Sequence, residues 1–487
     1  MDKKTKVMKK IATFIIVIMS VFGIANAQGD YEAFLFSQAD YWGTARFMGA
    51  GGAFGVTGGD FSALSTNPAS IGLYKRHEVS FTPMALNFIY TDSYYYDNKN
   101  STQKFKYTVP QVGIVLAKGI RQENGWKNWQ FGFGYNRIMD FNNSYRLNAQ
   151  VHNTLMNTVV DHVNGINYNN LSGDGRLAWN NWLIDTIPGM TDQYYSCFSD
   201  KDIDQRATVV RSGSIDEMIF SFGGNFNDKL YFGATLGFPF LSFKETTTYT
   251  ETPAMEDNIS GINDYTLQSE QRNSGTGVNL KLGVIYQPVD FVRVGVAFHT
   301  PTYYWRVKDN FYRSLVAHYS SGKTNEDLYE NYNTFTLTTP LKFNLGASFI
   351  IAKRAFVSAE YEFQDYGMAT LYDDRYDYVK ENEATRDKYG IAHNIRVGGE
   401  INITQGFALR AGYRLKTSPY KLTKAPYNNT SHFISAGLGF RGRILFGDLS
   451  YVLRLNKDSY WLYDATGEAG QLATMSHSVI ATIGCKF

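Results

Sequence analysis

The sequence has little cysteine and, beyond its first 27 residues, no long apolar run. Its two cysteines, Cys197 and Cys485, lie in a predicted loop and at the C-terminus, so no disulfide is expected. A membrane-spanning helix needs about 18 or more consecutive apolar residues, and nothing after the N-terminal segment approaches that length. If the mature chain crosses a membrane, it can do so only as a closed β-barrel.

A basic surface field is also lacking. Removing residues 1–27 takes five lysines and one aspartate from the 47 basic and 45 acidic residues, which leaves a net charge near −2. Nucleic-acid-binding domains usually carry a strong positive excess. The composition therefore excludes nucleic acid as an expected partner.

The first 27 residues have the three parts of a secretory signal peptide. Five lysines between positions 3 and 10 form the basic part, and Ile11 to Ile24 form an apolar run of 14 residues. Ala25-Asn26-Ala27 is a small-x-small cleavage site. We therefore expect a signal peptide at 1–27 and an exported mature chain.

Aromatic residues, in contrast, are abundant. They make up 16% of the chain, and the mean hydropathy is −0.30. Transmembrane barrels place aromatic girdles at both membrane interfaces and keep a polar lumen and polar loops. A chain that is rich in aromatics but not hydrophobic overall fits that class.

From about residue 77 onward the hydrophobic pattern has a period of two. In one segment Leu280, Leu282 and Val284 alternate with Lys281 and Gly283, which is the pattern of apolar side chains toward lipid and polar ones toward the lumen. Fourteen such segments are predicted, at 77–90, 106–117, 127–141, 215–226, 229–244, 273–287, 290–306, 335–351, 354–366, 389–403, 406–418, 430–441, 444–456 and 474–487. The expected fold is all-β, a 14-stranded antiparallel transmembrane barrel over 77–487.

The predicted links alternate between short and long. Long polar links are expected at 91–105, 142–214, 245–272, 307–334, 367–388, 419–429 and 457–473. Bacterial outer-membrane barrels have short periplasmic turns and long extracellular loops. The pattern places the short turns and the C-terminal Phe487 on the periplasmic side of an outer membrane.

The run from Arg46 to Glu78 has seven glycines and is too irregular for a long helix or strand. Glycine permits positive φ and close backbone approach, and proline fixes φ. We interpret residues 28–76, called the hatch segment below, as an N-terminal extension and plug inside the barrel lumen. Its proposed hatch residues are Gly49, Gly51, Gly52, Phe54, Leu64, Asn67, Pro68 and Ala69.

Three motifs in this segment carry a family resemblance. Gly-Ala-Gly-Gly-Ala-Phe at 49–54, Ser-Ala-Leu at 62–64 and Asn-Pro-Ala at 67–69 resemble the hatch of the FadL/TodX family of outer-membrane barrels. The resemblance implies a monomeric channel for passive uptake of hydrophobic compounds, above all long-chain fatty acids, with no cofactor. It also implies capture by apolar outer loops, transfer to a site bounded by lumen and hatch, and a hatch shift that opens an exit through the wall or to the periplasm.

The link at 142–214 contains apolar residues at near-helical spacing. Val151, Leu155, Val159, Val163 and Ile166 predict an amphipathic helix at the barrel mouth. Such a helix could collect a hydrophobic ligand, as the resembled family's outer loops do, or it could simply pack onto the barrel rim.

Several charged residues are predicted to face the lumen. Arginine recognises carboxylates through a two-donor fork, so one of these residues could hold a fatty-acid head group; pairing among themselves or with the hatch is the alternative. The predicted ligand-contact residues are Phe47, Arg293, Arg396, Arg410 and Arg414, and the resemblance adds Phe34, Leu35 and Phe36 near the N-terminus.

Other functions have weaker support. Ser435 and His432 are predicted on opposite faces of one strand, and neither a nucleophile elbow nor an H-E-x-x-H motif is present, so no enzyme activity is expected. His299 and His393 are isolated, which disfavours a metal or haemin site. A structural or shuttle role in a protein-secretion system, as in the similar barrel PorV, stays open. Outer-membrane lipid, including lipopolysaccharide, is the remaining expected partner.

Overall fold

The computed structural model describes residues 29–120, 124–254, 261–322, 324–352, 354–421, 429–463 and 468–487. The predicted signal peptide lies outside these residues. None of the described helices is long and apolar enough to span a membrane.

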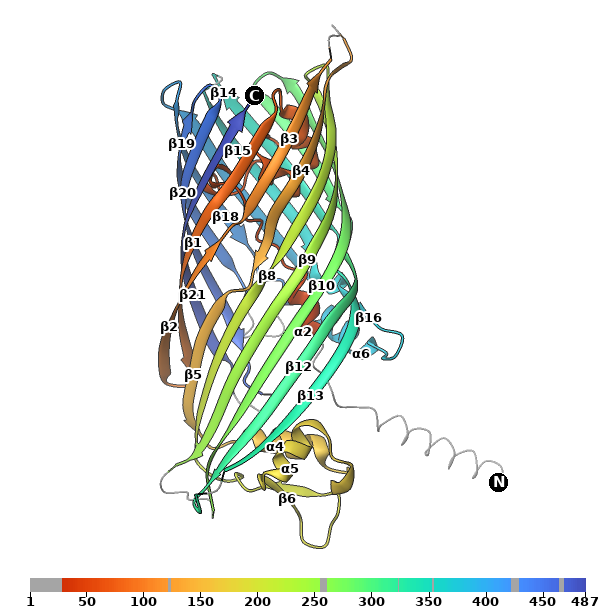
Figure 1. The fold of residues 1–487 in the computed structure, drawn as a ribbon, viewed down its shortest axis with the longest axis vertical. Helices are drawn as coiled ribbons and strands as arrows, with labels where there is room; N and C mark the ends of the chain where they lie inside the picture. Colours follow the sequence, from red (N-terminus) through yellow and green to blue (C-terminus); the bar gives the residue numbers. More distant parts are fainter. Residues whose placement is uncertain are drawn as a thin grey trace, which may run out of the picture.

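Fourteen strand passes close into an antiparallel barrel, in which β1 pairs with β21 (Figure 1). Four passes are interrupted by a short break, at β2/β3, β4/β5, β11/β12 and β13/β14. The strands are β1 (Glu78–Tyr95), β2 (Asn98–Thr108), β3 (Gln111–Gly119), β4 (Trp126–Asp140), β5 (Asn143–Val151), β8 (Ile203–Phe226), β9 (Leu230–Pro253), β10 (Ile262–Val289), β11 (Val292–His299), β12 (Tyr303–Tyr319), β13 (Thr324–Thr338), β14 (Lys342–Ile351), β15 (Ala355–Asp365), β17 (Ile391–Asn402), β18 (Phe407–Lys416), β19 (Ser431–Arg441), β20 (Leu445–Tyr460) and β21 (Gly470–Lys486), with a short β16 (Thr370–Tyr372) beside β13.

The alternation read from the sequence is confirmed. On β10, Leu280 and Leu282 are exposed on the outside, whereas Asn279 and Lys281 are buried inside. The short links and Phe487 lie together at one end, called the turn end, which is uppermost in Figure 1. The opposite end, with the long connections, is called the loop end.

Parts of the predicted long links are strands. The links expected at 91–105, 245–272 and 307–334 are taken up largely by the hairpins β1–β2, β9–β10 and β12–β13. The link expected at 142–214 likewise contains β5 and the first half of β8. These correct the predicted strand ends. Above the membrane neither face needs to be apolar, so the period-two signal fades while backbone pairing continues.

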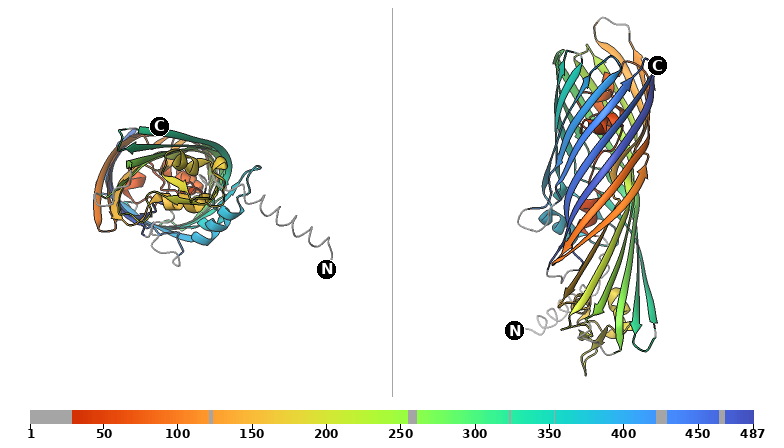
Figure 2. Two further views of the ribbon diagram at one scale, coloured as in Figure 1. Left: turned by 90° about the horizontal axis from the view of Figure 1, so that it is seen from below. Right: turned by 90° about the vertical axis from the view of Figure 1, so that its left-hand side faces the viewer.

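The remaining part of the 142–214 link folds into a small cap at the loop end. It contains α4 (Leu155–Val163), η3 (Tyr168–Asn170), α5 (Gly173–Asn180) and the hairpin β6 (Ile184–Thr186) and β7 (Tyr194–Ser196). The predicted helix is therefore shorter than Val151–Ile166, because the Thr154 hydroxyl caps its first turn and Val151 ends β5. Figure 2 (left) shows the cap across the barrel opening.

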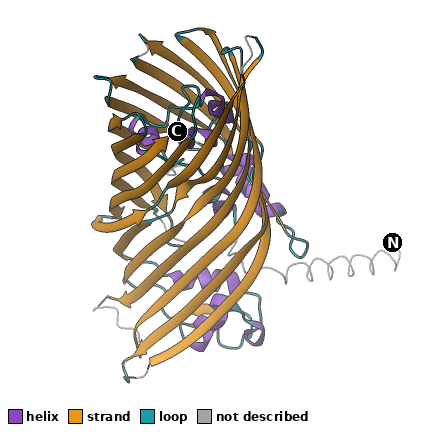
Figure 3. Ribbon diagram, turned by 45° about the horizontal axis from the view of Figure 1, so that its top comes forward, coloured by secondary structure: helices purple, strands orange, loops and turns teal. Residues whose placement is uncertain are grey.

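The described hatch segment lies inside the barrel (Figures 2 and 3). It has α2 (Asp30–Leu35) near mid-height and α3 (Ala45–Gly49), η1 (Phe61–Ser65) and η2 (Pro68–Leu73) toward the turn end. Two further elements, η4 (Tyr366–Met368) and α6 (Val379–Lys388), lie in the connection between β15 and β17. The division into domains at 76/77 stays a prediction, although β1 begins at Glu78.

Candidate functional site

Inward-facing glycines of the wall allow the hatch backbone to touch the barrel. A Cβ added at Gly398 would stand 2.0 Å from the carbonyl oxygen of Ala50, and one at Gly412 would stand 2.2 Å from the amide nitrogen of Gly51. Gly233 meets Pro68 at the same close range. We call the inward wall glycines that touch the hatch segment the glycine girdle: Gly113, Gly132, Gly134, Gly223, Gly233, Gly283, Gly295, Gly346, Gly398, Gly412 and Gly437.

The Asn-Pro-Ala motif is a helix start pressed against this girdle. Asn67 caps η2, and its Oδ1 accepts a hydrogen bond of 3.0 Å from the amide of Ala69. Pro68 occupies the first helical position, where its missing N–H has no consequence. A Cβ at Gly283 would stand 2.0 Å from the Asn67 oxygen. The motif thus fixes a turn whose outer surface fits the barrel wall.

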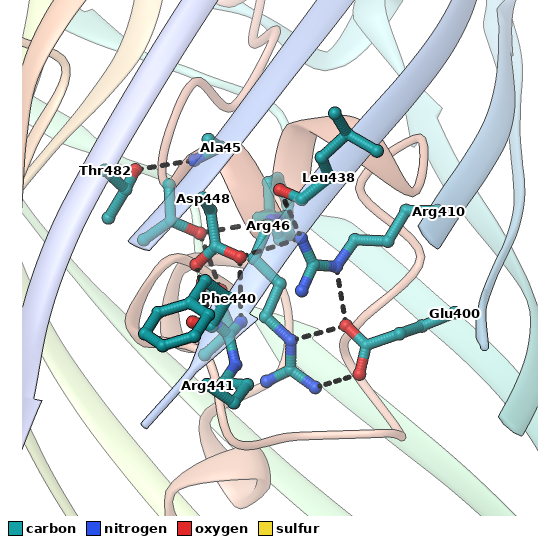
Figure 4. A network of polar contacts seen from close by, with 12 residues as sticks. Ala45, Arg46, Glu400, Arg410, Leu438, Phe440, Arg441, Asp448 and Thr482 are labelled. Atoms are coloured by element: carbon teal, nitrogen blue, oxygen red, sulfur yellow. Dashed lines mark hydrogen bonds and ion pairs between the residues drawn. The ribbon is translucent and has the colours of Figure 1, made fainter. Parts of the chain in front are cut away.

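A buried charge network fastens α3 to the wall (Figure 4). Both side-chain oxygens of Glu400 accept hydrogen bonds from Arg46, at 2.8 and 2.9 Å, and one of them also accepts from Arg410 at 2.6 Å. Arg410 continues to Asp448 at 2.7 Å, where Arg441 joins at 2.9 Å. Arg410 is therefore committed to two carboxylates.

A second buried cluster surrounds Asp40 of the hatch segment. Lys416 and Arg454 donate to its two carboxylate oxygens at 2.5 and 3.0 Å, and Arg414 donates to its backbone carbonyl. Burial alone would raise the pKa of Asp40, but the neighbouring cations Lys416, Arg454 and Arg414 hold the pKa well below its usual range. Asp40 is thus an ionised anchor between hatch and wall.

The other predicted ligand-contact residues are also engaged. Arg396 pairs with Glu362 at 2.7 Å, and Arg293 donates to the carbonyl oxygen of Thr57 at 2.8 Å. Phe47 is fully buried and packs near Phe54, with ring centroids 6.3 Å apart. The structure therefore places Arg396, Arg410 and Arg414 in polar networks and Arg293 against the hatch. Their predicted contact with ligand stays a prediction.

The cavity most relevant to ligand binding lies between the first part of the hatch segment and the wall, in the half of the lumen nearer the loop end. It has a volume of about 100 Å³ and polar and apolar walls in similar measure. Leu35 and Trp42 of the hatch segment line it, opposite Phe141, Asn142 and Arg454 of the wall. Three buried atoms on this lining have no hydrogen-bond partner among the described residues: Trp42 Nε1, Arg454 Nε and Asn142 Oδ1.

These unpartnered atoms are unusual, because buried polar groups are normally satisfied. Two of them are donors and one is an acceptor, so together they suit a polar head group in an otherwise mixed pocket. Of the residues suggested near the N-terminus, Leu35 lines the cavity. Phe34 and Phe36 instead pack in aromatic clusters with the wall, Phe34 stacked on Tyr389 at 4.7 Å and Phe36 against Phe243 at 5.6 Å.

Sequence reasoning did not single out Trp42, Asn142 or Arg454 as ligand contacts. The helix α2 and the break between β4 and β5 after Asp140 bring these residues together, and both are products of tertiary packing. A break in alternation at Phe141-Asn142 was the one local signal available, since β4 ends at Asp140 and β5 begins at Asn143.

A seam in the wall begins at the same break. Above it β5 pairs with β8 and β2 pairs with β1, and no backbone ladder joins β2 to β5 in the described part of the chain. Side chains bridge the two strands instead. Asn100 donates to Asn148 at 2.6 Å, and Thr102 donates to the carbonyl oxygen of Ser144. This seam begins beside the cavity.

The residues weighed for chemistry have ordinary structural partners. Ser435 points inward and donates to the Gly49 carbonyl at 3.1 Å, whereas His432 points outward. His299 contacts the carbonyl oxygen of Thr66 at 3.0 Å. Across the described ranges no three His, Cys, Asp or Glu side chains form a metal-binding group.

Solved structures resemble this fold over nearly its whole length. A Pseudomonas aeruginosa FadL homologue matches with a TM-score of 0.53 and 12% identity, covering 92% of this chain and 98% of that one. The Pseudomonas putida toluene transporter TodX matches with a TM-score of 0.52 and 14% identity, covering 92% and 99%. The chain therefore has the FadL/TodX type of outer-membrane barrel fold with an internal hatch.

No curated protein matches the chain in sequence. A family model described as BamG matches residues 189–446, which is more than half of the 487 residues. The chain belongs to the BamG family.

Proposed function

We propose that this protein is an outer-membrane channel for the passive uptake of hydrophobic compounds. The observation that carries the proposal is the cavity beside Phe141 and Asn142, whose mixed polar and apolar lining includes the unpartnered donors Trp42 Nε1 and Arg454 Nε. The fold shared with the FadL homologue and with a toluene transporter supports it. No step requires a cofactor or a covalent intermediate.

The finer proposal is an amphiphile with an anionic head, most simply a long-chain fatty acid. Its carboxylate would accept hydrogen bonds from Trp42 Nε1 and Arg454 Nε, the two donors on this cavity's lining that lack partners among the described residues. A cavity of about 150 Å³ holds one benzene ring, so the 100 Å³ cavity encloses the head and first carbons. The rest of the chain must lie along the seam or toward the cap.

The cap supplies a capture surface in this scheme. Trp182, Met190 and Tyr195 are 66%, 51% and 45% exposed there, although α4 itself packs onto the barrel extension through Met156 and Val159. The helix thus has the rim-packing role, and the exposed apolar residues of the hairpin are free to meet a ligand.

The exit that the structure favours is lateral, along the seam between β2 and β5. Passage to the periplasm would have to break the glycine-girdle contacts and both charge networks. The seam needs only side-chain bridges to part.

A structural role in a multiprotein assembly is the second candidate. It is favoured by the tight fixation of the hatch, which would suit a scaffold as well as a channel. In that case the cavity would hold no ligand.

Lipid mass spectrometry of the purified protein, with an unrelated barrel as control, separates the two. Channel function predicts enriched fatty acid or another hydrophobic compound, reduced in Trp42→Phe, which removes the indole donor and keeps an aromatic ring, and in Leu35→Trp, which fills the cavity. Gly447→Ala is the matched control, since its added Cβ lies 3.9 Å from its nearest neighbour. No enrichment, together with a stoichiometric protein partner, would favour the assembly role.

A further inference from the structure

Three tyrosine–histidine pairs form a row on the outward face of the barrel between β15 and β21. In each pair the tyrosine hydroxyl lies within hydrogen-bond distance of the histidine Nδ1. The pairs are Tyr361–His393 at 2.7 Å, Tyr413–His432 at 2.8 Å and Tyr451–His477 at 2.6 Å.

The three pairs repeat one geometry. Tyr413 stands opposite Ile434, and His432 stands opposite Leu415, so the pair spans one diagonal of the β18–β19 ladder. The other two pairs use the same diagonal on β15–β17 and β20–β21. Because neighbouring strands are about 4.8 Å apart, histidines on alternate strands lie about 10 Å from one another.

The row lies high on the membrane-facing wall. His432 is eight residues from Phe440 along β19, on the side toward the loop end. The outward residues between them include Ile434 and Leu438. At about 3.3 Å per residue and a tilt near 40°, the row stands about 20 Å above Phe440, in the upper part of an apolar band about 25 Å tall. At this level the head groups of the outer leaflet begin.

The opposite arc has no tyrosine–histidine pair among the described residues, although Tyr135 there accepts a hydrogen bond from Arg137. There phenylalanines pack together, with the Phe133 and Phe220 rings 4.8 Å apart and Phe220 and Phe238 6.0 Å apart. An ordinary aromatic belt would surround the barrel more evenly. The tyrosine–histidine pairs are therefore a property of one arc.

The tautomer of each imidazole decides what its free nitrogen offers. A tyrosine O–H that donates to Nδ1 leaves the proton of a neutral imidazole on Nε2. Within the described residues none of the three Nε2 atoms has a hydrogen-bond partner, although the His477 ring also meets Tyr90 edge-on, with ring centroids 5.8 Å apart. We propose that the three Nε2–H groups bind phosphate oxygens of outer-leaflet lipid head groups, so that this arc carries specifically bound phosphorylated glycolipid. This inference is independent of what the lumen transports.

The test uses the whole protein in nanodiscs and two matched triple variants. The row variant is Tyr361→Phe, Tyr413→Phe and Tyr451→Phe, which removes only three hydroxyls. The control variant is Phe133→Leu, Phe220→Leu and Phe238→Leu on the opposite arc. Heat-dependent gel mobility checks that each barrel has folded. Native mass spectrometry then measures the retention of diphosphoryl lipid A and of its dephosphorylated form.

We expect the row variant to retain about tenfold less diphosphoryl lipid A, since loss of the tyrosine donors removes the fixed tautomer and weakens three hydrogen bonds. The control variant and the dephosphorylated lipid should show no such difference. Imidazole ¹⁵N resonances of the unmodified protein should move on addition of diphosphoryl lipid A and not of inorganic phosphate. Equal retention by both variants, equal retention of both lipids, or the same shift with inorganic phosphate alone would overturn the proposal.

Discussion

The two halves of the lumen differ in how the hatch segment meets the wall. In the turn half, backbone touches backbone across the glycine girdle, and Arg46, Glu400 and Arg410 join the two parts through charge-assisted hydrogen bonds. In the loop half the same segment leaves a cavity with unpartnered polar atoms. The difference indicates that the lumen is sealed in the turn half, whereas a ligand would bind in the loop half.

The substitution with the largest expected effect places a side chain in the glycine girdle. In Gly412→Val the new Cβ alone would stand 2.2 Å from the amide nitrogen of Gly51, and tight interiors cannot absorb such overlap. We expect the hatch to be displaced and single-channel conductance for small ions to appear. Gly447→Val, on the outward face, is the control, and an unaltered conductance in Gly412→Val would contradict a tightly sealed turn half.

The next test breaks the network in Figure 4. Glu400→Gln removes the charge that Arg46 and Arg410 share, and loss of one partner from a buried ion pair typically costs about 3–5 kcal/mol. Hatch protection in hydrogen exchange should fall near α3 and stay the same near α2. Uniform loss over the whole segment would show that the two halves are not independent.

A smaller effect is expected from the Asn-Pro-Ala turn. Replacing Asn67, Pro68 and Ala69 with three glycines removes a cap and a fixed φ, for a combined cost of about 1–3 kcal/mol. The hatch should loosen, which small-solute leakage measures. Unchanged leakage together with unchanged uptake would mean that the girdle alone holds this turn.

The smallest and most local effect concerns Glu32 on α2. Burial raises the pKa of this carboxyl from its usual 4.5 to about 8, although hydrogen bonds from Gly29 and Gln271 act the other way. A raised carboxyl pKa favours the docked state at low pH, and that stability is lost as pH rises from about 4.5 toward 8. Amide exchange of α2, corrected for intrinsic rates, should therefore quicken over this range.

Glu32→Gln is the control for the pH effect. It keeps the shape of the side chain and cannot ionise, so its α2 exchange should not depend on pH after the same correction. Persistent pH dependence in this variant would assign the titration to another group.

The barrel was predictable because its signal is repeated. Alternation such as Leu280, Lys281, Leu282 appears in every pass, and the turns and loops alternate with it. The hatch was predictable from glycine density and from Asn67-Pro68-Ala69. The strand ends above the membrane, as in β9 and β10, could not be predicted, because a strand with two solvated faces has no periodic apolar pattern.

The cavity was less accessible to sequence reasoning. Arginine type and inward parity singled out Arg410 and Arg414, but parity says nothing about which carboxylate a side chain meets. Asp40 lies 374 positions from Arg414 in the chain and meets it only in space. Glu400, in contrast, is ten positions from Arg410 and stands opposite it on the neighbouring strand. Trp42 reaches the cavity only through the path of the hatch segment, and Asn142 only through the break between β4 and β5.

The most direct measurement is a cryo-electron-microscopy structure of the protein purified with its bound lipid. The account predicts elongated density that begins between Trp42 and Arg454 and runs toward Phe141, at the break between β4 and β5, with the glycine-girdle contacts intact. Density in the turn half beside a displaced hatch would contradict it, as would an empty cavity in protein that mass spectrometry shows to be loaded with lipid.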